Sequence, residues 1–439
     1  MTSPQRIAII GTGISGIGAG LALNHAGHEV VFYEKDRRPG GHSATVDIVH
    51  QGEEISVDTG FIVYNELNYP NLTAMFDWLK VETIASNMSF SVSADGGRFE
   101  WCGRDGQNVI RSLFAQRSNL FSPSYLKMLL EILKFQDRAR ADRANGTIGT
   151  GTLGDYLAQH KFSKRLRDDY LVPMGAAIWS TSPAKMLEFP AQSFIDFWDN
   201  HCLLQWNRPQ WRTVKGGSRN YVRRALRPFG DRVRLNAGVT KVIRDENGVT
   251  VIDHTGHQDR FHQVVIATHS PDALAMLVQP SRLEQHVLGS CTYSPNTVIL
   301  HRDTRLMPKR KDAWAAWNFL REGHDDTRKV AVTYWMNTLQ SIDNNHPTFV
   351  TLNPPFEPDP ALTFARFTYD HPLFDTAALE ARHHLDSIQG LNRTWFCGAW
   401  TGHGFHEDGL RSGLGVAQRM GAEAPWMAPP ARQEEVAAS

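Results

Sequence analysis

Several side chains that can exchange protons lie within or beside glycine-rich segments of this sequence. Imidazole, phenol and carboxylate groups can each accept or donate a proton during catalysis. The candidate catalytic residues of these types are His406, Glu407, His403 and Tyr64, and His42 and His269 occupy comparable positions. A histidine in a glycine-rich turn is more often a hydrogen-bonded scaffold residue, so each candidate has a structural interpretation beside the catalytic one.

The first strand, turn and helix have the spacing of a dinucleotide-binding unit. An apolar strand at 7–10 leads into Gly11-Thr12-Gly13-Ile14-Ser15-Gly16, a helix continues to Gly27, and a strand at 29–33 ends in Glu34. The first glycine allows the tight turn, the second lets the backbone approach a diphosphate, and the third brings helix and strand close. The helix N-terminus faces the phosphates, and Glu34 can bind ribose hydroxyls. The sequence therefore predicts an ADP-containing cofactor.

Composition limits the other classes of function. A chain of 439 residues exceeds what one hydrophobic core usually supports, so two domains are expected. Lys plus Arg and Asp plus Glu are 46 each, which gives no overall attraction to nucleic acid. The four cysteines are far apart and are expected to be reduced. No cluster of His, Cys or acidic residues has metal-ligand spacing, so no metal site is predicted.

Two further blocks of sequence resemble a known superfamily. The segment Lys35 to Thr45, with Gly40-Gly41, is similar to glutathione-reductase-like FAD proteins and above all to the flavin amine oxidase superfamily. Near the C-terminus, Phe396-Cys397-Gly398-Ala399-Trp400 and His406 to Gly413 resemble its FAD signature. The resemblance covers nearly the whole chain. It implies an FAD-dependent oxidoreductase with FAD in place of NAD, held without a covalent bond.

The superfamily resemblance and the glycine motif together give a set of cofactor-binding residues. The helix that begins near Gly409 and Leu410 is expected to direct its N–H groups at the flavin pyrimidine ring, where they would stabilise the reduced, anionic ring. Gly409 would be needed there because a Cβ would hold the backbone away from the ring. The predicted cofactor-binding residues are Gly11, Gly13, Ile14, Ser15, Gly16, Glu34, Lys35, Gly40, Gly41, His42, Ser43, Thr59, Gly60, Val239, Ala267, Thr268, Gly398, Ala399, Asp408, Gly409 and Leu410.

The order of these motifs predicts an interleaved α/β protein. A glutathione-reductase-like FAD-binding Rossmann domain would be formed by residues 1–80, 205–272 and 390–421. An α+β substrate domain would be formed by residues 81–204 and 273–389, and residues 422–439 are expected to be a flexible tail.

Shorter motifs favour an apolar substrate. Gly60 to Asn65, Asn200-His201, Arg208 to Arg212 and Gly404 to Gly409 resemble a bacterial subgroup of predicted FAD oxidoreductases. That subgroup is associated with cyclopropane-fatty-acid-synthase-like methyltransferases and with modification of membrane fatty acyl chains. Seven aromatic residues would either line an apolar substrate tunnel or pack in the protein core: Trp179, Phe194, Trp198, Trp206, Trp314, Trp317 and Trp335.

Three functions remain open at this point. The first is hydride removal from a C–H bond of an apolar substrate such as a fatty acyl chain, which would desaturate it or move a double bond. The second is oxidation of a C–N bond in an amine, and the third is a non-catalytic flavoprotein subunit of a lipid-modifying complex. The expected location is cytoplasmic.

Contact with the inner face of a membrane is a further option. A docking surface would use apolar and basic side chains between residues 109 and 140, although an ordinary helix with one core face explains the same pattern. The candidate residues are Arg111, Leu113, Phe114, Arg117, Leu120, Phe121, Lys127, Leu129, Leu130 and Lys134.

Overall fold

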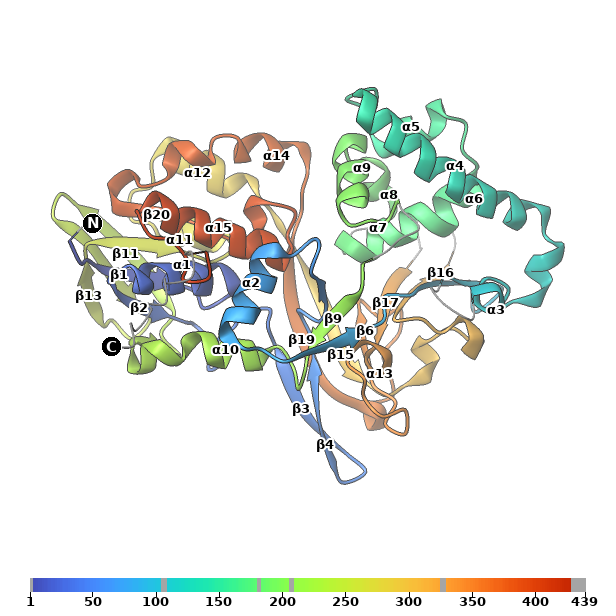
Figure 1. The fold of residues 1–439 in the computed structure, drawn as a ribbon, viewed down its shortest axis with the longest axis horizontal. Helices are drawn as coiled ribbons and strands as arrows, with labels where there is room; N and C mark the ends of the chain where they lie inside the picture. The colour runs from blue at the N-terminus through green and yellow to red at the C-terminus, as the bar shows by residue number, and fades with distance from the viewer. Residues whose placement is uncertain (1–2, 104–108, 180–182, 205–208, 324–328, 428–439) are drawn as a thin grey trace, which may run out of the picture.

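A computed structural model describes residues 3–103, 109–179, 183–204, 209–323 and 329–427. Two lobes lie side by side, and they are joined by strands that pass between them (Figure 1). The first lobe contains both glycine-rich motifs, and the second contains most of the helices between residues 109 and 200.

The N-terminal unit folds as its sequence predicts. Strand β1 (Arg6–Ile10), helix α1 (Ile14–His25) and strand β2 (Glu29–Tyr33) form a β-α-β unit, with β1 and β2 parallel. The turn between β1 and α1 contains the first three glycines, and Glu34 directly follows β2. The mixed α/β fold class is confirmed.

Distant segments complete the sheet of the first lobe. The strand order is β10-β2-β1-β14-β20, and every pair is parallel. The added strands are β10 (Val233–Arg234), β14 (Gln263–Ile266) and β20 (Thr394–Phe396). An antiparallel sheet of β11 (Val239–Asp245), β12 (Gly248–Asp253) and β13 (Gln258–Phe261) shares a buried apolar cluster with these strands.

Helix α15 (His406–Arg419) packs against α1 over the parallel sheet. Gly413 permits this contact, because a Cβ at that position would lie 2.0 Å from the backbone oxygen of Ser15. The other helices of this lobe are α2 (Pro70–Leu79), α10 (Arg219–Leu226), α11 (Ser270–Met276), α12 (Arg282–Ser290) and α14 (Thr376–Arg382).

A seven-stranded sheet forms the base of the second lobe. Its strand order is β19-β15-β18-β17-β16-β7-β8, and all its pairs are antiparallel except β16 with β7. The strands are β7 (Phe90–Ala94), β8 (Phe99–Gly103), β15 (Tyr293–His301), β16 (Trp317–Glu322), β17 (Lys329–Trp335), β18 (Phe349–Leu352) and β19 (Thr363–Pro372). A short helix, α13 (Met336–Leu339), follows β17.

Helices cover one side of this sheet (Figure 1). They share a single apolar core with its strands. The helices are α3 (Val109–Leu113), α4 (Pro123–Asn145), α5 (Leu153–Gln159), α6 (Lys164–Leu166), α7 (Val172–Trp179), α8 (Pro183–Leu187) and α9 (Ala191–Asn200).

Two small sheets lie where the lobes meet. The first is the hairpin of β3 (Thr45–His50) and β4 (Glu53–Asp58). The second has the order β5-β9-β6, from β5 (Tyr64–Asn65), β6 (Thr83–Ser86) and β9 (Trp211–Val214). Strand β9 therefore returns the chain from the helices to the cofactor-side lobe. The exact domain boundaries stay a prediction.

The structure of residues 422–427 differs from the flexible tail that the sequence predicts. Ala422 and Ala424 are buried, and the ring of Trp426 lies 5.6 Å from that of Trp78. The expected flexible tail is therefore wrong for residues 422–427, because small and aromatic side chains pack there. The rest of that tail lies outside the described residues.

None of the helices in the described ranges is both long and apolar enough to cross a membrane.

Candidate active site

Three neighbouring parallel strands end beside one another. Ile10 of β1 pairs with Ile266 of β14, which pairs with Phe396 of β20. The three turns that follow contain Gly11 to Gly16, Ala267-Thr268 and Gly398-Ala399, so the predicted cofactor residues of these segments lie at one edge. The carboxyl edge of such a sheet is where ligands bind in open α/β folds.

The first glycine turn leaves room for a ligand. A Cβ on Gly11 would lie 2.6 Å from the Ala267 oxygen, and one on Gly16 would lie 2.1 Å from the Gly11 oxygen. A Cβ on Gly13 would meet nothing within 4 Å. Gly13 is also the N-cap of α1 and no side chain caps the helix. The open side of Gly13 and the uncapped N–H groups of α1 fit a diphosphate.

Glu34 lies beside this turn and is buried. Its carboxylate accepts hydrogen bonds from the backbone N–H groups of Thr12 (3.1 Å) and Asp36 (3.0 Å), and from the Thr12 hydroxyl. Thr12 Oγ1 in turn accepts from the Gly40 N–H at 3.1 Å. Sequence analysis did not single out Thr12, which joins the two glycine motifs. A threonine between two glycines of such a turn was the available signal.

The second glycine motif faces the first. Gly40 and Gly41 have φ angles of +108° and +54°. A Cβ on Gly41 would lie 3.4 Å from Gly13 Cα, and one on Gly60 would lie 2.2 Å from the His42 oxygen. Thr59 donates from its N–H to the Ala44 oxygen at 2.8 Å. Residues 40–44 and 59–61 therefore run side by side next to Gly13.

The other predicted cofactor residues take several positions. Lys35 has a 71% exposed side chain that lies 3.8 Å from Asp272, so it points to solvent. Val239 is half-buried at the start of β11. The Gly398 N–H bonds the Ser412 hydroxyl at 3.2 Å. Ile14 and Ser15 lie at the start of α1, where they face α15.

The start of α15 corrects the prediction for Gly409 and Leu410. The Gly409 N–H is paired with the Phe405 oxygen at 3.0 Å, because the helix begins at His406. A Cβ on Gly409 would lie 2.8 Å from Ile14 Cγ2, so the missing side chain makes room for α1. The unpaired N–H groups belong to the first three helical residues, His406, Glu407 and Asp408.

Both acidic residues at this helix end have structural partners. Glu407 accepts from the N–H groups of Asn71 (3.1 Å) and Leu72 (3.0 Å), and from Asn71 Nδ2 at 2.6 Å, so it caps α2. Asp408 accepts from the N–H groups of His403 and Phe405, both at 3.1 Å. We therefore correct the catalytic assignment of Glu407 to a helix cap. Asp408 holds the loop before α15.

Tyr64 is also a structural residue. It is buried in β5, and its ring lies 5.2 Å from Phe76 and 6.3 Å from Tyr69. Its hydroxyl donates to Thr83 Oγ1 at 3.4 Å. The packing of three aromatic rings gives this side chain a structural role, and its catalytic assignment stays a prediction.

His406 is held by a small polar network. Its Nε2 lies 2.7 Å from the Tyr221 hydroxyl and 3.2 Å from Ser43 Oγ, and its ring stacks on Phe61 at 3.8 Å. Burial lowers the pKa of His406 to about 3, with a smaller contribution from His42. The imidazole is therefore neutral and fixed by both a ring contact and a hydrogen bond. This geometry fits a scaffold residue.

Three other histidines form a cluster next to the second glycine motif. The ring of His42 lies 6.0 Å from each of His269 and His371, and 5.3 Å from Tyr369. Burial, His371 and His269 lower the pKa of His42 to about 3, and burial lowers that of His371 to about 4. Within the described residues, no group of His, Cys, Asp or Glu could hold a metal ion. The cluster is a set of uncharged imidazoles.

His403 lies in the loop before α15, near the helical lobe. Burial lowers its pKa, and Asp408 opposes that shift. Its ring lies 6.2 Å from Phe197 of α9. Within the described residues, His403, His42 and His269 are the predicted proton-exchanging groups without a side-chain hydrogen bond. His371, which the sequence did not predict, lies 3.2 Å from Asn296 Nδ2.

Aromatic side chains continue from this loop into the helices. Phe405 stacks on Phe197 at 4.9 Å, and Phe197 lies 4.7 Å from Trp179. Trp179 lies 5.9 Å from Phe194, which stacks on Trp198 at 4.8 Å. This series, defined as Phe405, Phe197, Trp179, Phe194 and Trp198, links the loop to α7 and α9.

The remaining predicted aromatic residues are elsewhere. Trp314 and Trp335 contact each other at 5.4 Å and hydrogen-bond through their indole N–H groups to Pro308 and Asn337. Trp317 lies in β16, with its ring 4.9 Å from that of Tyr334. Trp206 lies outside the described residues.

A sequence model of the family described as flavin containing amine oxidoreductase matches residues 14–353. The chain belongs to this family. Its members are FAD-dependent oxidoreductases, and this flavin amine oxidoreductase is an enzyme with FAD as its cofactor. FAD would be held by the open side of Gly13, by the uncapped N-terminus of α1 and by Glu34. All four cysteines are buried, and none forms a disulfide.

Solved structures share the fold at low sequence identity. Putrescine oxidase bound to putrescine has a TM-score of 0.67 at 16% identity, covering 96% of this chain and 99% of that one. A fatty acid isomerase from P. acnes has 0.70 at 13% identity, covering 95% and 99%. Cyclohexylamine oxidase from Brevibacterium oxydans IH-35A has 0.64 at 16% identity, covering 95% and 100%.

A curated protein matches only locally. The NADH-dependent glutamate synthase of Schizosaccharomyces pombe is 57% identical over 37 residues, which is 8% of this chain and 2% of that protein.

The neutral state of His406 gives a prediction about acid stability. A histidine whose folded pKa lies below its unfolded value of 6.5 stabilises the fold fully above pH 6.5, and this contribution falls as the pH drops toward about 3. His406→Gln should therefore retain FAD at pH 8 and keep the rate of flavin reduction within about threefold of the parent. Between pH 6 and 4 it should lose less thermal stability than the parent does. Thermal melts and stopped-flow reduction across pH measure both effects. A pH-dependent loss of rate of about 100-fold would make His406 a proton-transfer group.

Proposed function

We propose that this flavin amine oxidoreductase removes hydride from a C–H bond of an apolar substrate, most suitably a fatty acyl chain. Hydride leaves one carbon, a proton leaves its neighbour, and a C=C bond remains in the substrate. In double-bond rearrangement the same electrons return to the chain. When bound, FAD supplies the hydride acceptor.

The observation that carries the proposal is that both carboxylates at the start of α15 are already engaged in hydrogen bonds. Within the described residues, the carboxylates of Glu407 and Asp408 accept hydrogen bonds from helix and loop N–H groups. The imidazoles of His42, His371 and His406 are neutral at physiological pH because their pKa values are about 3 to 4. An ammonium group would find no available carboxylate among these residues, whereas an apolar chain needs none.

The aromatic series supports the same conclusion. Its side chains form continuous apolar packing that begins at Phe405, beside the start of α15, and Trp179, Phe194, Phe197 and Trp198 within it are buried. The indole Nε1 atoms of Trp179, Trp198 and Trp317 are buried without a hydrogen-bond partner. Burial also raises the pKa of the nearby Tyr334 phenol. Surroundings that leave indole N–H groups unpaired favour an uncharged substrate over a cation.

The three-histidine cluster is suited to the proton that accompanies the hydride. His42 directly follows Gly41 of the second glycine motif, and His269 directly follows Thr268 of the β14 turn. Burial lowers the pKa of both imidazoles, so a proton taken up there is released again, as a transient relay requires. The likeness to a fatty acid isomerase shows a shared fold and makes acyl chemistry a reasonable choice among the family's substrates.

Product analysis tests the proposal. The purified holoenzyme is incubated anaerobically, with an artificial electron acceptor, with an unsaturated free fatty acid, a phospholipid carrying the same chain, and putrescine or cyclohexylamine. Mass spectrometry should show loss of two hydrogens or a moved double bond in an acyl substrate, and no aldehyde or ketone from either amine. Turnover of an amine with unchanged acyl chains would contradict the proposal.

A further inference from the structure

Large apolar side chains are concentrated on one surface of the helical lobe. Six of the fifteen exposed large hydrophobic residues in the described chain lie between residues 110 and 133. Phe121 is 87% exposed, Ile110 is 76% exposed and Leu130 is 68% exposed, and the others are Leu120, Leu126 and Leu133. We call these six residues the apolar patch. Exposed large apolar side chains gathered in one short segment are a feature of interaction sites.

The apolar patch is not explained by the core of the lobe. Met128 and Phe135 are fully buried and define the core-facing side of α4. Leu126, Leu130 and Leu133 follow at spacings of four and three residues, which places them on one stripe of the helix. At 100° per residue that stripe lies roughly opposite to the core-facing side. Helix α4 therefore has one apolar face for the core and a second one toward solvent.

Basic residues surround the patch. Between residues 109 and 140 there are six cations, Arg111, Arg117, Lys127, Lys134, Arg138 and Arg140, and two acids, Glu131 and Asp137. Glu131 is buried and accepts a hydrogen bond from the Ser163 hydroxyl. Lys127 and Lys134 flank the leucine stripe at about 80° to 100° from Leu126. Asp137 is exposed and pairs with Arg140, and Lys127 lies 3.7 Å from Glu131, so the charge next to the patch has a positive excess.

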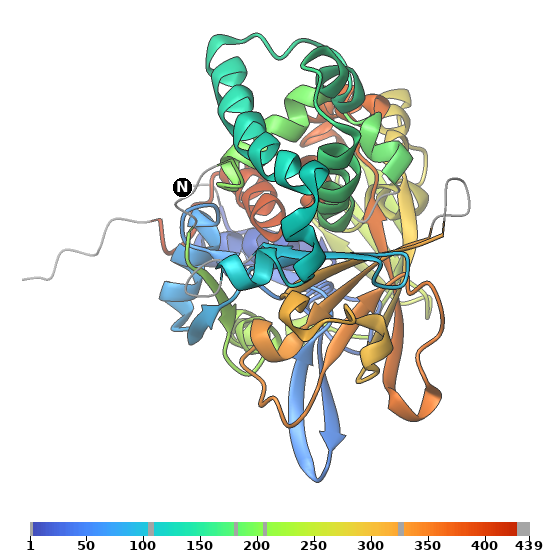
Figure 2. The same ribbon diagram turned by 90° about the vertical axis from the view of Figure 1, so that its right-hand side faces the viewer.

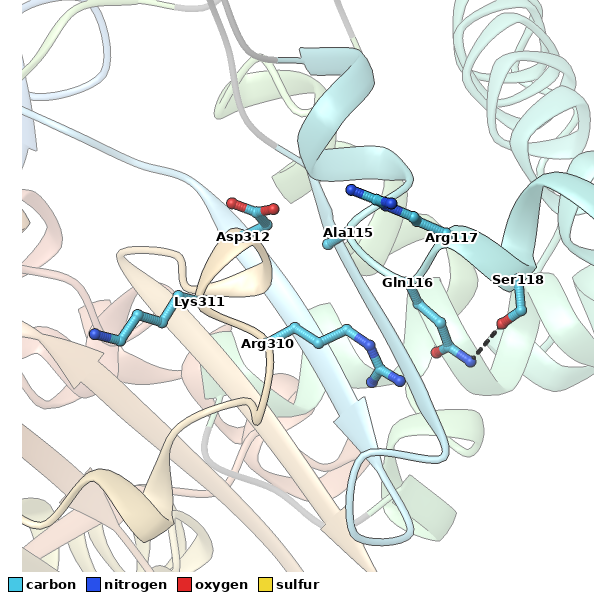
Figure 3. Close-up of a pocket in the computed structure, with 7 residues that line it drawn as sticks. All are labelled: Ala115, Gln116, Arg117, Ser118, Arg310, Lys311 and Asp312. Carbon is cyan, nitrogen blue, oxygen red and sulfur yellow. Dashed lines mark hydrogen bonds between the residues drawn. The ribbon is translucent and has the colours of Figure 1, made fainter.

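A basic pocket continues this surface (Figure 3). It has a volume of about 510 Å³ and lies between residues 115–118 and 310–312. Arg117 and Arg310 contribute cations, the Lys311 ammonium group extends away from the other lining residues in Figure 3, and Asp312 is paired with Arg111 at 2.8 Å. Arg310 also bonds Glu100 at 2.8 Å, whereas Lys311 is exposed. An anionic lipid headgroup matches this combination of charge and position.

We propose that the apolar patch and its basic border dock on the surface of an anionic lipid bilayer. Figure 2 shows α3 and α4 toward the viewer, on the side of the molecule opposite to the cofactor-side lobe in Figure 1. Aromatic and aliphatic side chains would enter the acyl boundary while Arg and Lys contact headgroups. Self-association would bring the same cations together, so a second copy of this chain suits the surface poorly.

The structure changes the set of residues expected from the sequence. Leu113, Phe114 and Leu129 are half-buried and pack against the core, so they cannot enter a bilayer. Ile110, Leu126 and Leu133 take their place. Arg117, Leu120, Phe121, Lys127, Leu130 and Lys134 remain on the exposed side.

Vesicle flotation of the holoenzyme tests the proposal. Vesicles of phosphatidylglycerol mixed with phosphatidylcholine should carry the protein upward at low salt, and phosphatidylcholine alone or high salt should weaken binding. Phe121→Ser with Leu130→Ser should reduce partitioning by at least about tenfold, and Lys127→Glu by at least about fivefold. Val49→Ser replaces an equally exposed apolar residue on the β3–β4 hairpin and should change nothing. Flavin absorbance confirms that each variant is folded.

Three results would overturn the proposal. The first is no flotation with anionic vesicles at low salt. The second is equal flotation of the Phe121→Ser, Leu130→Ser variant and the parent. The third is a dimer in sedimentation analysis that this variant dissociates while vesicles bind neither protein.

Discussion

Gly13→Ala should remove stable FAD binding while leaving the apoprotein folded. A Cβ at this position meets no protein atom within 4 Å, and the backbone has an ordinary φ of −65°. The new methyl group would instead occupy the open side of the turn, where a diphosphate must approach the α1 N–H groups. Losing two such charge-assisted hydrogen bonds at about 1.5 kcal/mol each weakens FAD binding by at least about 100-fold.

Fluorescence titration with FAD and a thermal melt of the apoprotein measure the two effects separately. The free energy of unfolding of the apoprotein should fall by no more than about 1 kcal/mol, since alanine is a poorer N-cap than glycine. Gly415→Ala is a matched control. Gly415 lies on α15, away from the glycine turn, and a Cβ there also meets nothing within 4 Å. Unchanged FAD affinity in Gly13→Ala would mean that the diphosphate does not bind at this turn.

Gly413→Ala should destabilise the whole protein. Its Cβ would lie 2.0 Å from the Ser15 oxygen and 3.2 Å from the Ala19 nitrogen, and both are backbone atoms that cannot rotate away. Helices α1 and α15 would have to separate, which costs about 1 to 3 kcal/mol or more. Gly415→Ala, two residues along the same helix, should be neutral or stabilise the fold by up to about 1 kcal/mol.

Chemical unfolding of both variants measures this difference. FAD should also be lost from Gly413→Ala, because α1 carries the diphosphate site. If both variants unfold at the same denaturant concentration as the parent, the close packing of α1 on α15 would be wrong.

Local sequence pattern was enough for the β-α-β unit. The strand, the three glycines, the helix and Glu34 lie within 28 residues, and each has a local physical reason. Helix α11 also begins with a local signal, because Pro271 lies in its first turn. The seven-stranded sheet could not be predicted in this way, because β7 pairs with β16 more than 200 residues later.

The structural roles that local pattern missed at the candidate site have a common cause, which is that they depend on contacts with other elements. Glu407 lies among motif residues, but its partners Asn71 and Leu72 are 335 to 336 residues away. Tyr64 is fixed by rings of Tyr69 and Phe76, which no local pattern assigns to it. The start of α15 was placed three residues late because Gly409 was taken as a helix boundary, whereas the structure uses it for packing on α1.

The aromatic series also gives the two proposals a physical connection. Phe135, on the core-facing side of α4, lies 5.9 Å from Trp198 at one end of that series. Helix α4 therefore contacts the apolar interior on one side and carries the apolar patch on the other. The two proposals remain separately testable, because vesicle binding does not require turnover.

Hydride removal from an acyl chain can be followed on the flavin itself. Its most direct test is anaerobic single-turnover mixing of the FAD-loaded enzyme with an unsaturated acyl substrate, with and without deuterium next to its double bond, while visible flavin absorbance is followed. We expect bleaching of the flavin, lasting or transient, that slows several-fold with the deuterated chain. We expect no bleaching by putrescine. Bleaching by the amine, with an unchanged flavin spectrum in the presence of acyl chains, would contradict it.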